Sequence, residues 1–152
     1  MRALGIDYGQ RRIGLALSDA TGLLARPWKT ITATGAPARV AAALAAEIDA
    51  LAAEADGLSA VALGYPRRLS GEANDQTRAV EAIAATLRTL IRVPIVLQDE
   101  RLSSHEADGR LALIERDWRK RKARLDAAAA AVILQDYLDS RTLAPSPAAI
   151  ED

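Results

Sequence analysis

The sequence predicts a single α/β domain, built on a mixed five-stranded sheet with helices on both faces. The chain has 152 residues, which suits one hydrophobic core. Three strand patterns come first, and single strands then alternate with helices, so parallel strands should follow an antiparallel meander through right-handed crossovers. We expect the domain to span residues 1–140 and a tail to span 141–152.

The opening meander is predicted by three short apolar runs. Residues 2–8 and 12–19 are separated by a turn at 9–11 that begins with glycine, which favours two antiparallel strands. Residues 24–31 form the third run and contain Pro27. Because proline cannot donate a ladder hydrogen bond, this strand is expected at an edge of the sheet.

Two amphipathic helices and two buried strands are expected next. Apolar side chains recur at helical spacing in 38–55 and in 74–92. The short apolar runs 59–63 and 93–97 predict parallel strands, and residues 64–71 are expected to form a loop.

The last third of the chain predicts two more helices separated by charge. Ser103 and Glu106 have the spacing of a capping box, which indicates a helix start. The block 116–124 contains six basic residues and is expected to be a charged loop, after which 125–138 predicts the final, alanine-rich helix.

Composition excludes several classes of protein. The absence of Cys rules out disulfide frameworks, thiolate metal sites and cysteine nucleophiles. No apolar run approaches the ~20 residues of a membrane span, and the 20 basic and 20 acidic residues argue against a generally basic polyanion binder. We expect a protein of the reducing cytoplasm with no membrane partner.

Acidic residues are predicted to converge at one edge of the sheet. Asp7 ends the first strand, and Asp99 and Glu100 follow the last one. Since the carboxyl ends of parallel strands meet at one edge, where ligands of α/β sheets bind, this edge is the expected site. By alternation Asp99 lies on the opposite strand face from Glu100 and is the weaker candidate, and the role of Asp19 stays open.

Small residues predict a close helix contact beside Asp7. Asp7 shares a strand face with Gly5, and Gly14 and Ala16 form a comparable face on the second strand. The alanine-rich last helix is the natural occupant of this surface. Asp126 leads its apolar stripe, so a third carboxylate should point to the same edge.

Three carboxylates at one edge predict a divalent cation. They repel one another and are costly to bury unless a cation compensates, and hard oxygen ligands suit Mg²⁺ or Mn²⁺. A pair of such ions about 4 Å apart can hydrolyse a phosphodiester. Arg11, Arg12 and Arg101 lie beside the acids and are expected to hold phosphates. Each acid taken alone also has an ordinary interpretation, as a turn or helix-terminal residue.

Four sequence blocks carry a family resemblance. They are Gly-Ile-Asp-Tyr-Gly (5–9) with Arg-Ile-Gly-Leu-Ala (12–16), Gly-Tyr-Pro (64–66), Asp-Glu-Arg-Leu (99–102), and Asp-Ala-Ala-Ala (126–129) with Ile-Leu-Gln-Asp-Tyr-Leu (133–138). In these blocks the chain resembles the YqgF/RuvX family of pre-16S rRNA nucleases, related in fold to RuvC Holliday junction resolvases and RNase H. It departs from the family at Ser103 and Ser104, where two threonines are usual, and at Tyr65, where an aliphatic residue is usual.

The resemblance implies an RNase H-like fold and a metal-dependent nuclease that processes the 5′ end of pre-16S rRNA. It further implies that Asp7, Glu100 and Asp126 are the metal-binding catalytic acids. Two alternatives stay open: a resolvase that cleaves four-way DNA junctions as a symmetric dimer, and a non-catalytic RNA-binding factor for ribosome assembly.

Further residues are candidates for contact with nucleic acid, which we expect to be RNA or structured DNA bound by a monomer or weak homodimer. Basic side chains can grip phosphates, and an aromatic ring can stack on a base. Besides the arginines beside the acids, these candidates are Arg67, Arg68, Ser103, Ser104, Trp118, Arg119, Lys120, Arg121 and Lys122.

Overall fold

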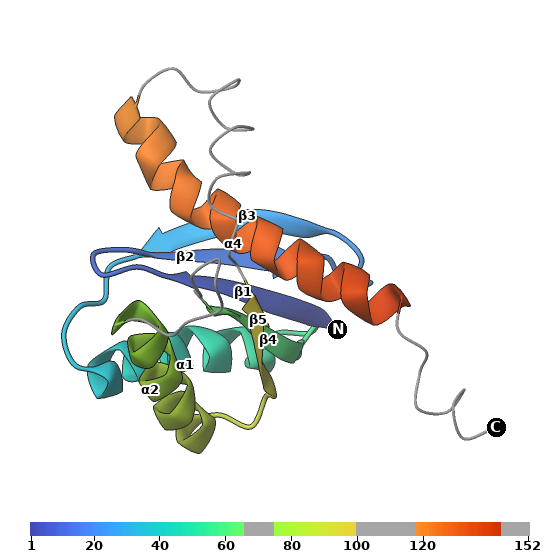
Figure 1. Cartoon of the computed structure of the whole chain (residues 1–152). Helices are drawn as coiled ribbons and strands as arrows, with labels where there is room; N and C mark the ends of the chain where they lie inside the picture. Colours follow the sequence, from blue (N-terminus) through green and yellow to red (C-terminus); the bar gives the residue numbers. More distant parts are fainter. Residues whose placement is uncertain (66–74, 100–117, 144–152) are drawn as a thin grey trace.

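The computed structural model describes residues 1–65, 75–99 and 118–143, which form a five-stranded mixed sheet (Figure 1). The strand order is β3-β2-β1-β4-β5, in which β1–β3 are antiparallel and β1, β4 and β5 are parallel. The expected meander followed by parallel strands is therefore confirmed. The strands are β1 (Arg2–Tyr8), β2 (Ile13–Ser18), β3 (Ala25–Ile31), β4 (Leu58–Tyr65) and β5 (Ile95–Asp99).

Helices cover both faces of the sheet, as the sequence predicts. α1 (Pro37–Ala53) and α2 (Asp75–Leu90) pack together on one face, and α4 (Trp118–Leu143) crosses the other (Figure 1). β3 lies at an edge, and its pairing with β2 shifts register next to Pro27, which fits the missing amide donor of that residue. No helix in these described ranges is long and apolar enough to cross a membrane.

The two faces of the sheet have different cores. Under α1 and α2 the sheet presents large aliphatic side chains, including Leu4, Ile6 and Leu15. Under α4 the buried sheet residues are small, because alternate positions on β1, β2 and β4 are alanine or glycine. Those small residues are Ala3, Gly5, Gly14, Ala16, Ala60 and Ala62.

The small residues let the backbone of α4 rest directly on the sheet. A Cβ atom added to Gly14 would lie 1.9 Å from the carbonyl oxygen of Asp126, and one added to Gly5 would lie 2.7 Å from that of Ala130. No side chain other than hydrogen fits at either position. The close contact predicted from the small faces is therefore confirmed.

A glutamine side chain holds the middle of α4 against the start of β3. The Oε1 atom of Gln135 accepts a hydrogen bond from the amide of Ala25 at 2.9 Å, and its Nε2 atom donates to the carbonyl of Leu23 at 3.0 Å. Both backbone groups lie at the edge of the sheet, and among the strands in the described part of the chain only β2 pairs with β3. Gln135 thus satisfies edge groups and sets the position of α4 along the sheet.

The end of β4 and the start of β5 differ from the sequence prediction. β4 continues through Gly64 and Tyr65, which we expected in a loop, because both residues pair with the end of β5. β5 begins at Ile95 rather than at residue 93. Pro94 has no amide to donate, and its carbonyl instead accepts from the amide of Val61, so the regular ladder starts one residue later.

The charged block was wrongly expected to be a loop. α4 begins at Trp118, so residues 118–124 are helical, and the helix extends to Leu143. This part of the block contains Arg, Lys, Ala and Trp but no Gly or Pro, and Arg, Lys and Ala are good helix formers, so charge alone does not end the helix. The helix expected to start at Ser103 lies outside the described residues.

Asp19 closes the turn between β2 and β3. Its Oδ2 atom accepts from the hydroxyl of Thr21 at 2.6 Å, and its Oδ1 atom accepts from the amides of Leu23 and Leu24 at 3.0 and 3.2 Å. These bonds, that of Thr21 first, hold the pKa of Asp19 below its ordinary value of 3.8. Asp19 therefore acts as a turn residue.

We predict that Gly14→Ala destabilises the fold, since the new methyl group collides with backbone that cannot rotate away. Overpacking of this kind costs about 1–3 kcal/mol or more, measured as the loss in free energy of unfolding in urea. Ala42→Ser adds one heavy atom on the exposed side of α1 and should change stability by less than about 0.5 kcal/mol. Equal stabilities of the two variants would contradict the close contact.

We also predict that Thr21→Val raises the pKa of Asp19 toward 3.8, because the hydroxyl donor is lost. Carboxyl NMR titration measures this directly, with Thr34→Val as the control that should leave Asp19 unchanged. Since the pKa is lower in the folded protein, the contribution of Asp19 to stability is present above about pH 3.8 and is lost as the pH falls through the folded pKa. An unchanged pKa in Thr21→Val would exclude this cause.

Candidate active site

Four α4-facing positions form one row across the carboxyl end of the sheet. Asp7 pairs with Gly14 on β2, and Gly64 pairs with Gln98 on β5. Ile6 pairs with Leu63, so Asp7 and Gly64, the next residue of each strand, lie at the same level. Leu4 and Ile6 face the α1–α2 core, and alternation therefore turns Asp7 toward α4.

The contact at Gly14 brings Asp126 to Asp7. Gly14 lies against the backbone of Asp126, and Asp7 is its directly paired neighbour on the next strand. Residues directly opposite in an antiparallel pair present their side chains on the same face, so Asp7 lies on the α4 side of the sheet, beside the position that contacts the backbone of Asp126. Both residues are half-buried. Two of the three acids expected at this edge are thus neighbours.

Arg12 forms an ion pair with Asp126. Its Nε atom lies 3.0 Å from Oδ2 of Asp126, and this oxygen is buried. The two side chains are 32% and 27% exposed, so the pair is partly shielded from water and from salt. Arg12 therefore compensates the charge of a carboxylate that the close packing of α4 removes from solvent.

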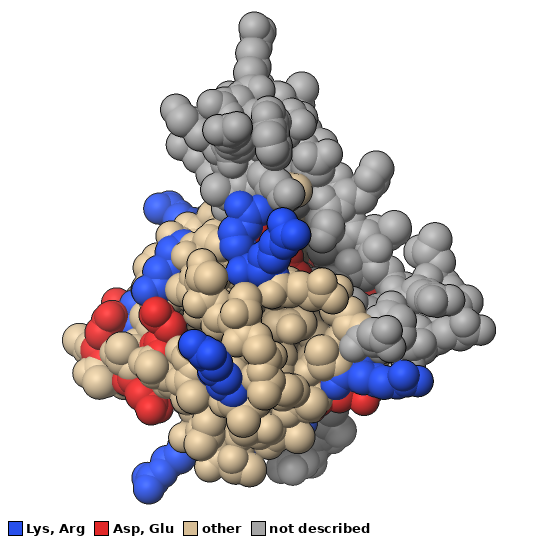
Figure 2. All heavy atoms as spheres, turned by 90° about the vertical axis from the view of Figure 1, so that its left-hand side faces the viewer, with Lys and Arg blue, Asp and Glu red and all other residues tan. Residues whose placement is uncertain are grey.

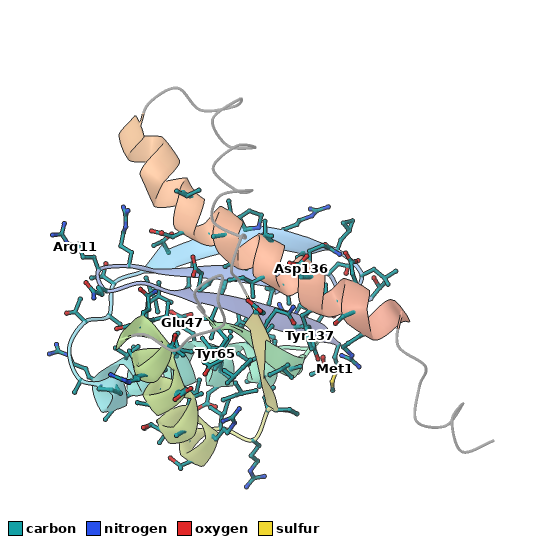
Figure 3. The ribbon with its side chains drawn as sticks, in the orientation of Figure 1. Met1, Arg11, Glu47, Tyr65, Asp136 and Tyr137 are labelled. Carbon is teal, nitrogen blue, oxygen red and sulfur yellow. The ribbon has the colours of Figure 1, made fainter. Side chains whose placement is uncertain are left out.

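The turn between β1 and β2 adds exposed positive charge to this edge. The turn is tight, since a Cβ atom on Gly9 would lie 2.6 Å from the carbonyl oxygen of Arg12. Arg11 lies exposed at its tip and points away from the sheet (Figure 3). Figure 2 looks at this edge and shows Lys and Arg atoms gathered beside carboxylate atoms in the middle of the face. The arrangement suits a polyanionic ligand.

Contacts from α2 hold the strand ends in place. The Nε2 atom of Gln76 donates a hydrogen bond to the carbonyl of Tyr8 at 2.9 Å, and the hydroxyl of Tyr65 donates to Oε1 of Glu81. Tyr8 and Tyr65 are the last residues of β1 and β4. The site therefore stands on strand ends that are tied to a helix on the opposite face.

For the remaining predicted site residues the structure describes no side-chain position. Trp118, Arg119, Lys120, Arg121 and Lys122 belong to the first turns of α4, with no described side chains. Six further candidates lie outside the described residues: Arg67, Arg68, Glu100, Arg101, Ser103 and Ser104.

The two acids whose roles stayed open occupy different places. Asp19 follows β2, which runs antiparallel to β1, so it lies at the opposite end of the sheet from Asp7. Asp99 lies at the same edge as Asp7 but on the strand face of Ile95 and Leu97, which pack against the α1–α2 core. Neither residue joins Asp7 and Asp126 on the α4 side.

Sequence reasoning missed two features of this edge. Gln98 is half-buried on the α4 side of the sheet, in the same row as Asp7. Its position follows from alternation with Leu97 once the strand is known to continue to residue 99. The pairing of Arg12 with Asp126 has no sequence signal, because it depends on how α4 crosses β2.

The two described acids on the α4 side of this edge, Asp7 and Asp126, are suitable ligands for a hard divalent cation. Asp7 and Asp126 supply carboxylate oxygens, which Mg²⁺ and Mn²⁺ prefer. Among residues 1–65, 75–99 and 118–143, no three His, Cys, Asp or Glu side chains are grouped as a metal site. The third expected ligand, Glu100, lies outside these ranges.

Known proteins are similar to this chain over nearly its whole length. A family model described as "RuvX: Holliday junction resolvase" matches residues 1–140. A protein of Opitutus terrae described as "Putative pre-16S rRNA nuclease" is 39% identical, covering 97% of each chain. One of Bacillus subtilis with the same description is 34% identical, covering 92% of this chain and 99% of the relative.

Two solved structures share the fold. RuvC of T. thermophilus in complex with a Holliday junction substrate superposes with a TM-score of 0.53 at 18% identity, covering 94% of this chain and 96% of RuvC. The fowlpox virus Holliday junction resolvase gives 0.54 at 12% identity, covering 93% and 99%. At these identities the likeness shows the fold alone, which is RuvC-like and RNase H-like. The family match and the relatives show that this chain belongs to the RuvX family.

Proposed function

We propose that this protein is a metal-dependent nuclease that hydrolyses phosphodiester bonds at the 5′ end of pre-16S rRNA. The observation that carries the proposal is the juxtaposition of Asp7 and Asp126, which the contact at Gly14 holds next to each other beside an arginine-bearing turn. The relatives described as pre-16S rRNA nucleases support the choice of substrate. We propose that residues 1–140 form the nuclease domain, that 141–152 form a tail, and that the protein acts in the cytoplasm as a monomer or weak homodimer.

In this proposal Asp7, Glu100 and Asp126 hold Mg²⁺ or Mn²⁺. When bound, such an ion supplies a Lewis acid for phosphodiester hydrolysis. The chain's own contribution is to fix the carboxylates on rigid elements, one at a strand end and one on a helix that cannot move closer.

Basic residues around the acids are proposed to bind the RNA backbone. Arg11 is exposed beside the site, and the helical residues 118–122 include four further basic residues and Trp118. The chain has no net charge, so attraction of a polyanion depends on this local concentration of arginine and lysine. We add Arg67, Arg68, Arg101, Ser103 and Ser104 to this surface as proposed contacts.

We predict that Asp7→Asn lowers the rate of cleavage of a precursor rRNA fragment at least about a hundredfold, because a metal-binding charge is lost. Cleavage by the wild type should require Mn²⁺ or Mg²⁺ and stop with a chelator. Asp49→Asn makes the same change on the exposed side of α1 and should leave the rate unchanged. Equal rates in Asp7→Asn and the wild type would contradict the proposal.

The same assay separates the two alternatives. A synthetic four-way DNA junction, cut symmetrically and in preference to RNA, would indicate a resolvase, as the description of the family model suggests. Binding of RNA without cleavage, equal in the wild type and Asp7→Asn, would indicate a non-catalytic assembly factor. Metal-dependent cleavage of RNA that is lost in Asp7→Asn is the result we expect.

We predict that Arg11→Gln weakens binding of RNA without changing the fold, because an exposed phosphate contact is removed. The slope of log affinity against log salt should fall by about one unit, measured by fluorescence anisotropy with Asp7→Asn as the background to prevent cleavage. Arg26→Gln changes an exposed arginine on β3 and serves as the control, with an unchanged slope. A slope that also stays unchanged in Arg11→Gln would remove Arg11 from the binding surface.

A further inference from the structure

We propose that Arg12 is a positioning residue that pairs with Asp126 where the metal ion would bind, orienting this carboxylate and competing with the cation for it. The inference rests on the proposed function, in which Asp126 is a metal ligand. It assigns Arg12 to an acid of the site rather than to a substrate phosphate.

The geometry of the pair supports this role. Nε of Arg12 lies 3.0 Å from Oδ2 of Asp126, an atom that is buried. Arg12 precedes β2 by one residue, and alternation places it on the same side as Gly14, facing α4. The contact at Gly14 fixes the backbone of Asp126. Since Arg12 is two residues before Gly14, the same helix–strand contact positions both partners of the ion pair.

The charges around Asp126 explain why the positive guanidinium of Arg12 is needed next to it. A buried carboxylate oxygen is costly unless a positive group lies next to it. Asp7 adds a second negative charge on the same side of the sheet. The Arg12 guanidinium offsets this repulsion, and a metal ion bound to the same oxygen would displace it.

The neighbouring arginine provides a matched control. Arg11 is exposed at the tip of the turn, and it forms no ion pair in the part of the chain that the structure describes. It has the same side chain, and it is adjacent in sequence. Any effect that depends only on positive charge near the site should appear in Arg11→Gln as well.

The test compares the full-length wild type with Arg12→Gln, Arg12→Lys and Arg11→Gln, without RNA. Mn²⁺ affinity is measured by titration calorimetry, and the midpoint of thermal unfolding is measured with a chelator. We expect Arg12→Gln to bind Mn²⁺ about tenfold more tightly, because the competing charge is gone. We expect it to unfold about 3 °C or more below the wild type in chelator.

The control variants distinguish this role from a purely structural one. Arg12→Lys keeps the charge and should stay within about twofold of the wild type in Mn²⁺ affinity, whereas Arg11→Gln should match the wild type in both measurements. The double variant Arg12→Gln with Asp126→Asn removes both charges and should recover the unfolding midpoint lost in Arg12→Gln alone. Packing of the arginine side chain by itself predicts no such recovery.

An unchanged or weaker Mn²⁺ affinity in Arg12→Gln would overturn the inference, as would Mn²⁺ binding to none of the variants. No recovery in the double variant would overturn it as well. The expected Mn²⁺ response in a protein that cleaves no RNA would contradict the proposed nuclease function while supporting the role of Arg12. The two proposals therefore fail on different measurements.

Discussion

The approach of α4 to the β1–β2 pair positions the acids of the proposed active site. Gly5 and Gly14 let the backbone of the helix rest on the backbone of the sheet, and a single added methyl group would be 2.7 Å or less from a helix carbonyl oxygen at either point. The helix carries Asp126 at one end of this contact, and the strand paired with Gly14 carries Asp7. If α4 were held further out by larger side chains, the two acids would separate. The alanine-rich core on this face is therefore what builds the site.

Carboxylates placed at the same edge repel one another, and arginine side chains at this edge offset that repulsion. Arg12 lies against the buried oxygen of Asp126, and Arg11 remains exposed for a ligand outside. The opposite face of the sheet is an aliphatic core. There α1 and α2 bury large aliphatic side chains, and Gln76 and Tyr65 link α2 to the strand ends. The large aliphatic core and the proposed active site thus lie on different faces of one sheet.

The sequence was sufficient for the sheet, its edge strand at Pro27 and the close contact of α4 with the small residues of β1 and β2, because strand alternation and small residues report directly on packing. The sequence was insufficient where tertiary contacts determine the end of an element or the partner of a side chain. The charge of residues 118–122 suggested a loop, but helix-forming residues continue α4 there. Pairing with β5 extends β4 through Tyr65, and Asp19 turned out to serve a turn at the far end of the sheet. The partner of Arg12 depends on where a helix crosses a strand, which local sequence does not encode.

The most direct test of this account is a crystal structure of the protein grown with Mn²⁺, in which the anomalous scattering of the metal gives its position. We predict a peak at the carboxylates of Asp7 and Asp126, with the guanidinium of Arg12 moved away from Asp126. A structure in which Mn²⁺ binds elsewhere, or in which the Arg12–Asp126 pair stays closed at saturating Mn²⁺, would contradict it.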